Sequence, residues 1–243
     1  MGASTDEAQI NVALDVANQV VDVLSGRNAT SAINIPALKP QKLEAVKDYM
    51  ELAENIASFA SQISKGAIKS LNIAFSGKLS SLDVSPLEIA ILKGILSANL
   101  QDVNYVNAPL IAKQRGIEIK TSKTNDSKDT IELKVITTAG ESLVKGELVA
   151  QGIKKITQIN DYHTSIEPQK RMLLVPHTNK VNMVAQVAVV LGSNNVNISG
   201  MQVVRGYGDK SVMVINVDTD VEKATLDKIN EIDGVDDALC INI

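Results

Sequence analysis

The sequence is poor in aromatic residues and in cysteine. Phe, Tyr and Trp make up 2% of its 243 residues, Trp is absent, and Cys240 is the single cysteine. One cysteine excludes an internal disulfide and a cysteine-based zinc site, and its place in an apolar segment predicts a small buried side chain. With few aromatic rings and a net charge of −4, the chain also lacks the stacking surfaces and basic groove of a single-stranded nucleic-acid binder.

Long hydrophobic runs are missing as well. No apolar stretch approaches the roughly 20 residues of a membrane span. Residues 1–4 lead straight into a charged segment, so we expect no signal peptide, no membrane partner and a cytoplasmic protein. The hydrophobic content of 44% and the charged content of 21% are typical of globular domains, and the length allows one large or two modest ones.

Motifs for catalysis are also missing. The chain has neither a Gly-x-Gly-x-x-Gly sequence after a strand nor a P-loop lysine motif. Gly206-Tyr207-Gly208 stands between two expected strands and predicts a hairpin turn. The two histidines, His163 and His177, are too isolated to indicate a metal site or a catalytic triad. We therefore expect no catalytic centre, no metal and no cofactor in this chain.

Three parts follow one another along the sequence. Ser4–Glu7 forms a capping box that opens an amphipathic helix, which Gly26 ends. A Pro- and Asn-containing linker follows, and then a helix over 41–63. The middle part alternates helices and strands, expected as strand 71–77, helices 85–98 and 107–115, and strands 117–121, 130–137, 142–150 and 154–160. The apolar stripe of the first helix is broad for an isolated helix and predicts a large partner surface.

The last part has the element order strand, helix, strand, strand, helix, strand. The expected elements are 172–177, 181–194, 197–205, 210–218, 222–232 and 235–243. This βαββαβ order predicts a ferredoxin-like antiparallel sheet with both helices on one face. The overall fold class is α+β.

Four polar residues of this last part are candidate ligand contacts. Taken singly, His177 predicts a strand-end residue bonded to the backbone, and Asn179, Asn182 and Asn197 predict turn, cap and strand-start residues. Together they would place an imidazole, amides and free helix N–H groups around a small polar cavity. Such a cavity suits a zwitterion, because it offers donors for a carboxylate and amide oxygens for an ammonium group.

A second, weaker candidate is Lys155, which follows Lys154 in an expected strand. A lysine pair most often forms a solvated face. The alternative is an anion contact, since a strand could present Lys155 inward.

Four segments carry a resemblance to a known family. The C-terminal part resembles an ACT domain, and the chain as a whole resembles the C-terminal regulatory region of long-form D-3-phosphoglycerate dehydrogenase. The matching segments are 2–9 with 11–17, 106–112 with 115–117, 159–162, and 175–182 with 196–203. The resemblance implies a residual helix and linker over 1–36, an intervening allosteric substrate-binding α/β domain over 37–168 and an ACT domain over 169–243.

The resemblance also implies a function. The region would sense L-serine for an NAD-dependent dehydrogenase of the phosphorylated pathway of L-serine biosynthesis, and the catalytic domains, with their NAD, would lie outside this chain. The partners it implies are L-serine as allosteric effector, a second copy in a homodimer or larger oligomer through the ACT domains, and a catalytic dehydrogenase chain. Two alternatives stay open: a β-type subunit of an iron–sulfur L-serine dehydratase, and a free-standing amino-acid-binding regulator.

Site residues can be carried over by the same resemblance. His177 and Asn179 would contact the effector from one subunit, and Asn197 with the backbone of Ile198 from its neighbour. The family commonly has Pro-Gly where this chain has Val181-Asn182, and asparagine tolerates the left-handed conformation that glycine would supply. Lys155 matches a lysine implicated in anion binding in some relatives, although Glu167 stands where one of them has an arginine.

Overall fold

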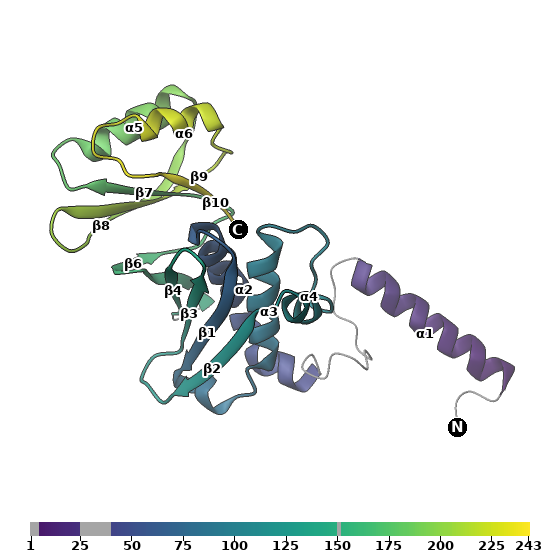
Figure 1. The fold of residues 1–243 in the computed structure, drawn as a ribbon. Helices are drawn as coiled ribbons and strands as arrows, with labels where there is room; N and C mark the ends of the chain where they lie inside the picture. Colours follow the sequence, from purple (N-terminus) through teal and green to yellow (C-terminus); the bar gives the residue numbers. More distant parts are fainter. Residues whose placement is uncertain (1–4, 25–39, 150–151) are drawn as a thin grey trace. The chain divides into compact units, whose positions relative to one another are not determined.

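The computed structural model describes residues 5–24, 40–149 and 152–243 (Figure 1). It divides the chain into two units, Met1–Ala45 and Val46–Ile243, which are described separately here. Ser4, Gly26 and the expected linker, including the predicted domain boundary after residue 36, lie outside the described residues.

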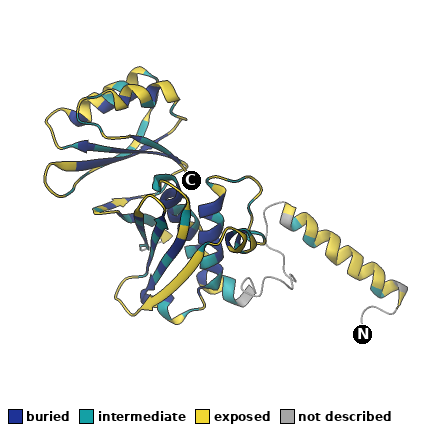
Figure 2. Ribbon diagram, in the orientation of Figure 1, coloured by how far each residue is buried: buried dark blue, intermediate teal, exposed yellow. Residues whose placement is uncertain are grey.

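Helix α1 (Asp6–Leu24) confirms the first expected helix. The Ala8 amide donates to Thr5 Oγ1 at 3.3 Å, so Thr5 closes the first turn as an N-cap residue. The apolar side chains of α1 are exposed, with Leu14 at 57% and Leu24 at 82% (Figure 2). The broad stripe seen in the sequence is therefore uncovered within its own unit.

A six-stranded sheet forms the first half of the second unit. Its strands are β1 (Ile68–Ser76), β2 (Glu118–Thr124), β3 (Thr130–Thr137), β4 (Glu141–Leu148), β5 (Lys154–Ile159) and β6 (Tyr162–Ile166). They lie in the order β2-β1-β3-β4-β5-β6. The β1–β2 pair is parallel and every other pair in this sheet is antiparallel.

Two helices cover one face of this sheet, α2 (Pro40–Ile63) and α3 (Ser85–Ser97) (Figure 1). Close packing requires glycine at two positions. A Cβ on Gly94 of α3 would lie 2.5 Å from the Glu54 carbonyl oxygen of α2, and one on Gly146 of β4 would lie 2.8 Å from Leu52 Cδ1. The core between helices and sheet is aliphatic, apart from Phe59 and Phe75, as the scarcity of aromatic residues requires.

Local details differ from the sequence-based expectation at two places. Ser85 followed by Pro86 predicts an N-cap at Ser85. The N-cap of α3 is instead Val84, and the Ser85 amide bonds Asp83 Oδ1 at 3.1 Å. The second difference is β6, a strand that is not among the expected elements, where Asp161-Tyr162 predicts a turn. Asn160 adopts a left-handed φ of 49°, which lets the chain reverse within two residues and pair again with β5. The short helices η2 (Gly77–Ser81) and α4 (Ala108–Gln114) complete this part.

The second half of the unit confirms the βαββαβ order. Its elements are β7 (Arg171–Thr178), α5 (Met183–Ser193), β8 (Ile198–Arg205), β9 (Lys210–Val217), α6 (Lys223–Asn230) and β10 (Leu239–Asn242). The strands form a four-stranded antiparallel sheet in the order β10-β7-β9-β8. Helices α5 and α6 lie on one face and enclose a core that includes Val175, Met183 and Met213 (Figure 1). The predicted boundary after residue 168 falls between β6 and β7.

Cys240 is partly buried and packs against the core of the C-terminal half, so the expectation of a buried side chain is met only in part. Its burial still raises the pKa of the thiol. Among the described residues, no helix has the length and apolarity needed to cross a membrane.

Candidate binding site

His177 lies near the end of β7 on the sheet face that packs against α5 and α6. Its side chain is 3% exposed, and its Nδ1 lies 3.0 Å from the Val175 carbonyl oxygen. Position 177 shares this face with Leu173 and Val175, both core residues, because alternate residues of a strand point the same way. This bond is the one predicted for His177 taken singly, as a strand-end residue bonded to the backbone. It fixes the ring and leaves Nε2 for another partner.

The loop after His177 is short and leads directly into α5. The Asn179 amide donates to the Asp209 carbonyl at 2.6 Å, which ties the loop to the start of β9. Asn182 is the N-cap of α5 with a φ of 74°, so the left-handed conformation expected of this asparagine is confirmed. Because the first N–H groups of a helix have no partner within it, this end of α5 offers donors and a partial positive charge.

Asn197 and Ile198 lie at the opposite end of the same sheet. His177 pairs with Ser211 at the start of β9, whereas the Asn197 carbonyl accepts a bond from the amide of Asp218 beyond its end. Ser211 and Asp218 are seven positions apart, which is about 23 Å along a strand. The expectation that all four polar residues surround one cavity is therefore wrong within a single chain.

Two exposed apolar surfaces flank this arrangement. Strand β8 is an edge strand of its sheet, so one side of its backbone has no partner strand. The adjacent helix α5 has no charged residue, and Val184 and Val189 on it are 40% and 66% exposed. Val203 of β8 is 44% exposed.

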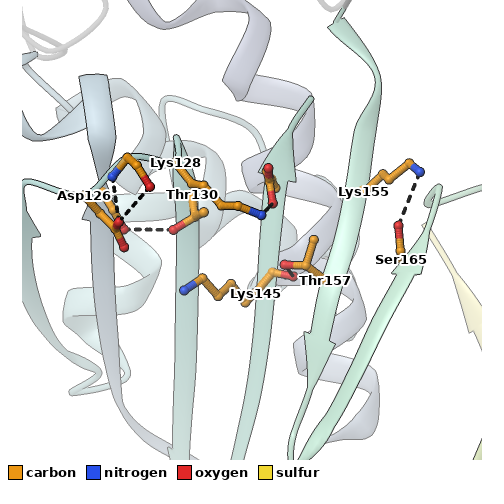
Figure 3. A network of polar contacts seen from close by, with 10 residues as sticks. Asp126, Lys128, Thr130, Lys145, Lys155, Thr157 and Ser165 are labelled. Carbon is orange, nitrogen blue, oxygen red and sulfur yellow. Dashed lines mark hydrogen bonds and ion pairs between the residues drawn. The ribbon is translucent and has the colours of Figure 1, made fainter. Parts of the chain in front are cut away.

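Lys155 lies on the face of the six-stranded sheet that faces away from the helices, which agrees with a solvated lysine pair and not with the inward orientation that was the alternative. Its Nζ is 3.3 Å from Ser165 Oγ on the neighbouring strand (Figure 3). Lys145, Thr157 and Gln158 line the same shallow depression, which measures about 470 Å³. The depression is a polar surface rather than an enclosed cavity.

Carboxylates balance the other lysines of this depression. Lys128 Nζ lies 3.3 Å from Glu147, and Lys145 Nζ lies 3.7 Å from Glu132 on the next strand. Glu167 is exposed and its backbone carbonyl accepts a bond from the Asn216 side chain at 3.1 Å. Lys155 is thus the lysine here whose described contact is a hydroxyl rather than a carboxylate.

The part of the chain that the structure describes contains no cluster of three or more His, Cys, Asp or Glu side chains able to hold a metal ion. The Gly206–Gly208 segment forms the expected hairpin turn between β8 and β9. Its Gly206 amide donates to the Lys210 carbonyl at 2.8 Å, and Gly208 has a φ of 66°. It therefore makes a turn, as the sequence predicts.

One buried residue of this region, Ser211, is not predicted from the sequence. Ser211 pairs with His177 across the β7–β9 ladder and is 1% exposed. No signal in the sequence marks it, because the two residues are far apart along the chain and only the strand register joins them.

Comparison with known proteins gives one family for this region. Residues 45–160 match the family described as the D-3-phosphoglycerate dehydrogenase intervening domain. All of this chain aligns with D-3-phosphoglycerate dehydrogenases from Synechocystis sp. at 38% identity, Methanocaldococcus jannaschii at 34% and Bacillus subtilis at 31%. It spans 45%, 47% and 47% of those three relatives, so it covers about half the length of each.

Likeness to solved structures is low. The ACT domain from the GTP pyrophosphokinase of Chlorobium tepidum aligns with 29% of this chain at 14% identity and a TM-score of 0.26, which is too low to bear on function. The match of residues 45–160 to the intervening-domain family and the alignment with the relatives are stronger. The whole chain is similar to about half the length of these D-3-phosphoglycerate dehydrogenases.

Proposed function

We propose that this chain is the regulatory region of an NAD-dependent D-3-phosphoglycerate dehydrogenase and that it binds L-serine between two copies of its C-terminal domain. NAD binding and hydride transfer belong to catalytic domains that it would serve as a partner. On this proposal the chain alone does not oxidise 3-phosphoglycerate.

The observation that carries the proposal is the separation of the two polar ends of β9. His177 and Asn179 lie at one end and Asn197 at the other, so one chain holds two half-sites rather than one site. Antiparallel pairing of β8 with β8 of a second copy would place Ile198 of each copy opposite Arg205 of the other. A two-fold axis repeats every contact, so both half-sites would be completed at once.

The exposed surfaces support this pairing. The open edge of β8 supplies backbone donors and acceptors, and the uncharged outer face of α5 supplies apolar area beside it. Val184 and Val189 would lose their contact with water on association. An apolar helix next to an unpaired strand is typical of a surface that another chain covers.

The chemistry of the completed site suits a zwitterionic amino acid. The free N–H groups of α5 and the His177 ring would hold the carboxylate, because a helix N-terminus favours an anion. The Asn179 and Asn197 amides contain both donors and acceptors, and their oxygens would accept from the ammonium group. The left-handed Asn182 starts the helix at this point and positions its N–H groups.

The test is calorimetry with L-serine on the parent chain and on Asn179→Ala and Asn197→Ala. Each substitution leaves a polar group of the ligand unpaired, which costs about 1–3 kcal/mol of binding free energy. Asn125→Ala, in an exposed loop, is the matched control and should bind as the parent does. Sedimentation should show that L-serine strengthens the dimer, since the ligand binds only the associated form.

Mixing Asn179→Ala with Asn197→Ala distinguishes a site shared between two copies from a site within one chain. In a mixed dimer, one site loses both asparagines and the other keeps both. After subunit exchange, about a quarter of all sites should regain the parent affinity. If the mixture binds no better than either variant alone, the site does not span two copies. If the parent does not bind L-serine, the proposed function is wrong.

We also propose that Lys155 binds an anion. Its support is that its described partner is Ser165, whereas Lys128 and Lys145 face carboxylates. Phosphate binding that Lys155→Ala weakens, and that Lys134→Ala leaves unchanged, would support the role.

A further inference from the structure

The hydroxyl of Ser211 is a buried polar group without a partner. Among the described residues, its Oγ has no hydrogen-bond partner, although the residue is 1% exposed. Buried hydroxyls in native proteins nearly always have a partner, and leaving one unpaired is costly. The Ser211 hydroxyl therefore has a capacity for hydrogen bonding that the described part of the chain does not use, as have Asn72 Oδ1 and Asn216 Oδ1.

The position of Ser211 links it to the candidate site. It is the cross-strand partner of His177, and both lie on the sheet face covered by the helices, as the buried neighbours Met213 and Val175 show. Directly opposed residues of an antiparallel pair have Cβ atoms about 5 Å apart. Met183, the first residue of α5, belongs to the same buried cluster, so the first turn of α5 lies over this end of the sheet.

Ser211 also lies on the line between the two half-sites. The residues paired across the sheet at this level are Arg205 of β8, Ser211 of β9 and His177 of β7. In the pairing proposed above, the second copy would bring its β8 start next to Arg205. Ser211 would then stand between His177 of one copy and Asn197 of the other.

We propose that the Ser211 hydroxyl bonds the side-chain hydroxyl of the bound amino acid and so selects L-serine over L-alanine. This inference rests on the proposed function. The carboxylate and ammonium groups are matched by the helix N–H groups, His177 and the asparagines, which leaves the ligand hydroxyl and Ser211 Oγ. Two hydroxyls can pair in either direction, because each is both a donor and an acceptor.

This assignment makes Ser211 a specificity-determining residue. A site built around a buried polar group rejects an analogue that lacks the matching group, because the buried partner is then left unpaired. L-Alanine has the size of L-serine without the hydroxyl, so we expect the parent chain to bind it at least about tenfold more weakly.

The experiment is calorimetry with L-serine and L-alanine on the full chain and on Ser211→Ala. The variant should bind L-serine about tenfold more weakly and L-alanine as well as the parent or better, so that the preference disappears. Ser142→Ala, the same change at a buried strand position of the six-stranded sheet, should leave both affinities unchanged. Ser211→Thr keeps the hydroxyl and should keep the preference, which covers the case in which Ser211→Ala fails to fold.

The outcomes distinguish the two proposals. If the parent binds neither amino acid, the proposed function fails. If the parent binds L-serine but Ser211→Ala retains the full preference, or loses affinity for both ligands equally, the role of Ser211 is wrong while the effector site stands. A parent that binds both amino acids equally also overturns the role of Ser211.

Discussion

The two sheets of the second unit differ in the face that the helices of their own domain leave uncovered. In the six-stranded sheet this face is polar: Lys145 pairs with Glu132 on the neighbouring strand, and Glu147 pairs with Lys128 in the loop before β3. In the four-stranded sheet the corresponding face is apolar and buried, with Val212 and Val214 at 1% and 0% exposure. A polar face is stable in water on its own, whereas an apolar face requires a cover.

Contacts with the preceding domain supply part of that cover. Gln202 Oε1 on β8 accepts from the hydroxyl of Thr164 and, at 2.7 Å, from the amide of Ser165, both on β6. At the other side of the sheet, Gln62 of α2 bonds both backbone groups of Asn242, at 2.7 and 3.0 Å. The C-terminal sheet is therefore covered on both faces, whereas the six-stranded sheet is covered on one face only.

The largest expected effect comes from a charge placed on the apolar face. Val214→Asp should lower the free energy of unfolding by about 3 kcal/mol or more, because the carboxylate would be buried without a partner. Urea unfolding of the parent and the variant measures this change in the free energy of unfolding. The matched change on the polar face, Thr157→Asp, should stay within about 1 kcal/mol, since Lys145 and Lys155 line the same depression. A mild effect of Val214→Asp would mean that this face meets water in solution.

An intermediate effect is expected from the contact between the two halves. Gln202→Ala removes the acceptor for Thr164 and Ser165 and should cost about 2 kcal/mol. Gln202→Glu keeps an acceptor at the same place and should cost less. Equal losses for both variants would show that the hydrogen bonds do not stabilise this contact.

The smallest effect is expected on the polar face itself. Glu147→Gln breaks the pair with Lys128, whose side chain is 67% exposed, and should change the free energy of unfolding by less than about 1 kcal/mol. The difference should shrink further at high salt, because exposed charges are screened. A large, salt-independent loss would show that this face is covered like the other.

Much of this architecture was predictable from local patterns. The βαββαβ order of the C-terminal half followed from apolar periodicity and turn residues, and β3 was predicted with the bounds that the structure gives. The missed strand β6 follows a tight reversal that depends on the left-handed conformation of Asn160, and a short polar strand has little periodicity to detect. The apolar stripes of α1 and α2 look alike in sequence, yet Leu52 and Ile56 of α2 are fully buried while those of α1 are exposed.

The sequence by itself determined the residue types of the candidate site and the helix start at Asn182, because capping and turn preferences act within a few residues. Only the tertiary structure decided which of these residues meet. Strand register joins His177 to Ser211 and separates both from Asn197, and this register depends on pairing between distant segments. The apolar sequences of the C-terminal strands predict that both faces of this sheet are buried. Which residues cover the second face depends on tertiary contacts, such as that of Thr164 with Gln202, which no local pattern encodes.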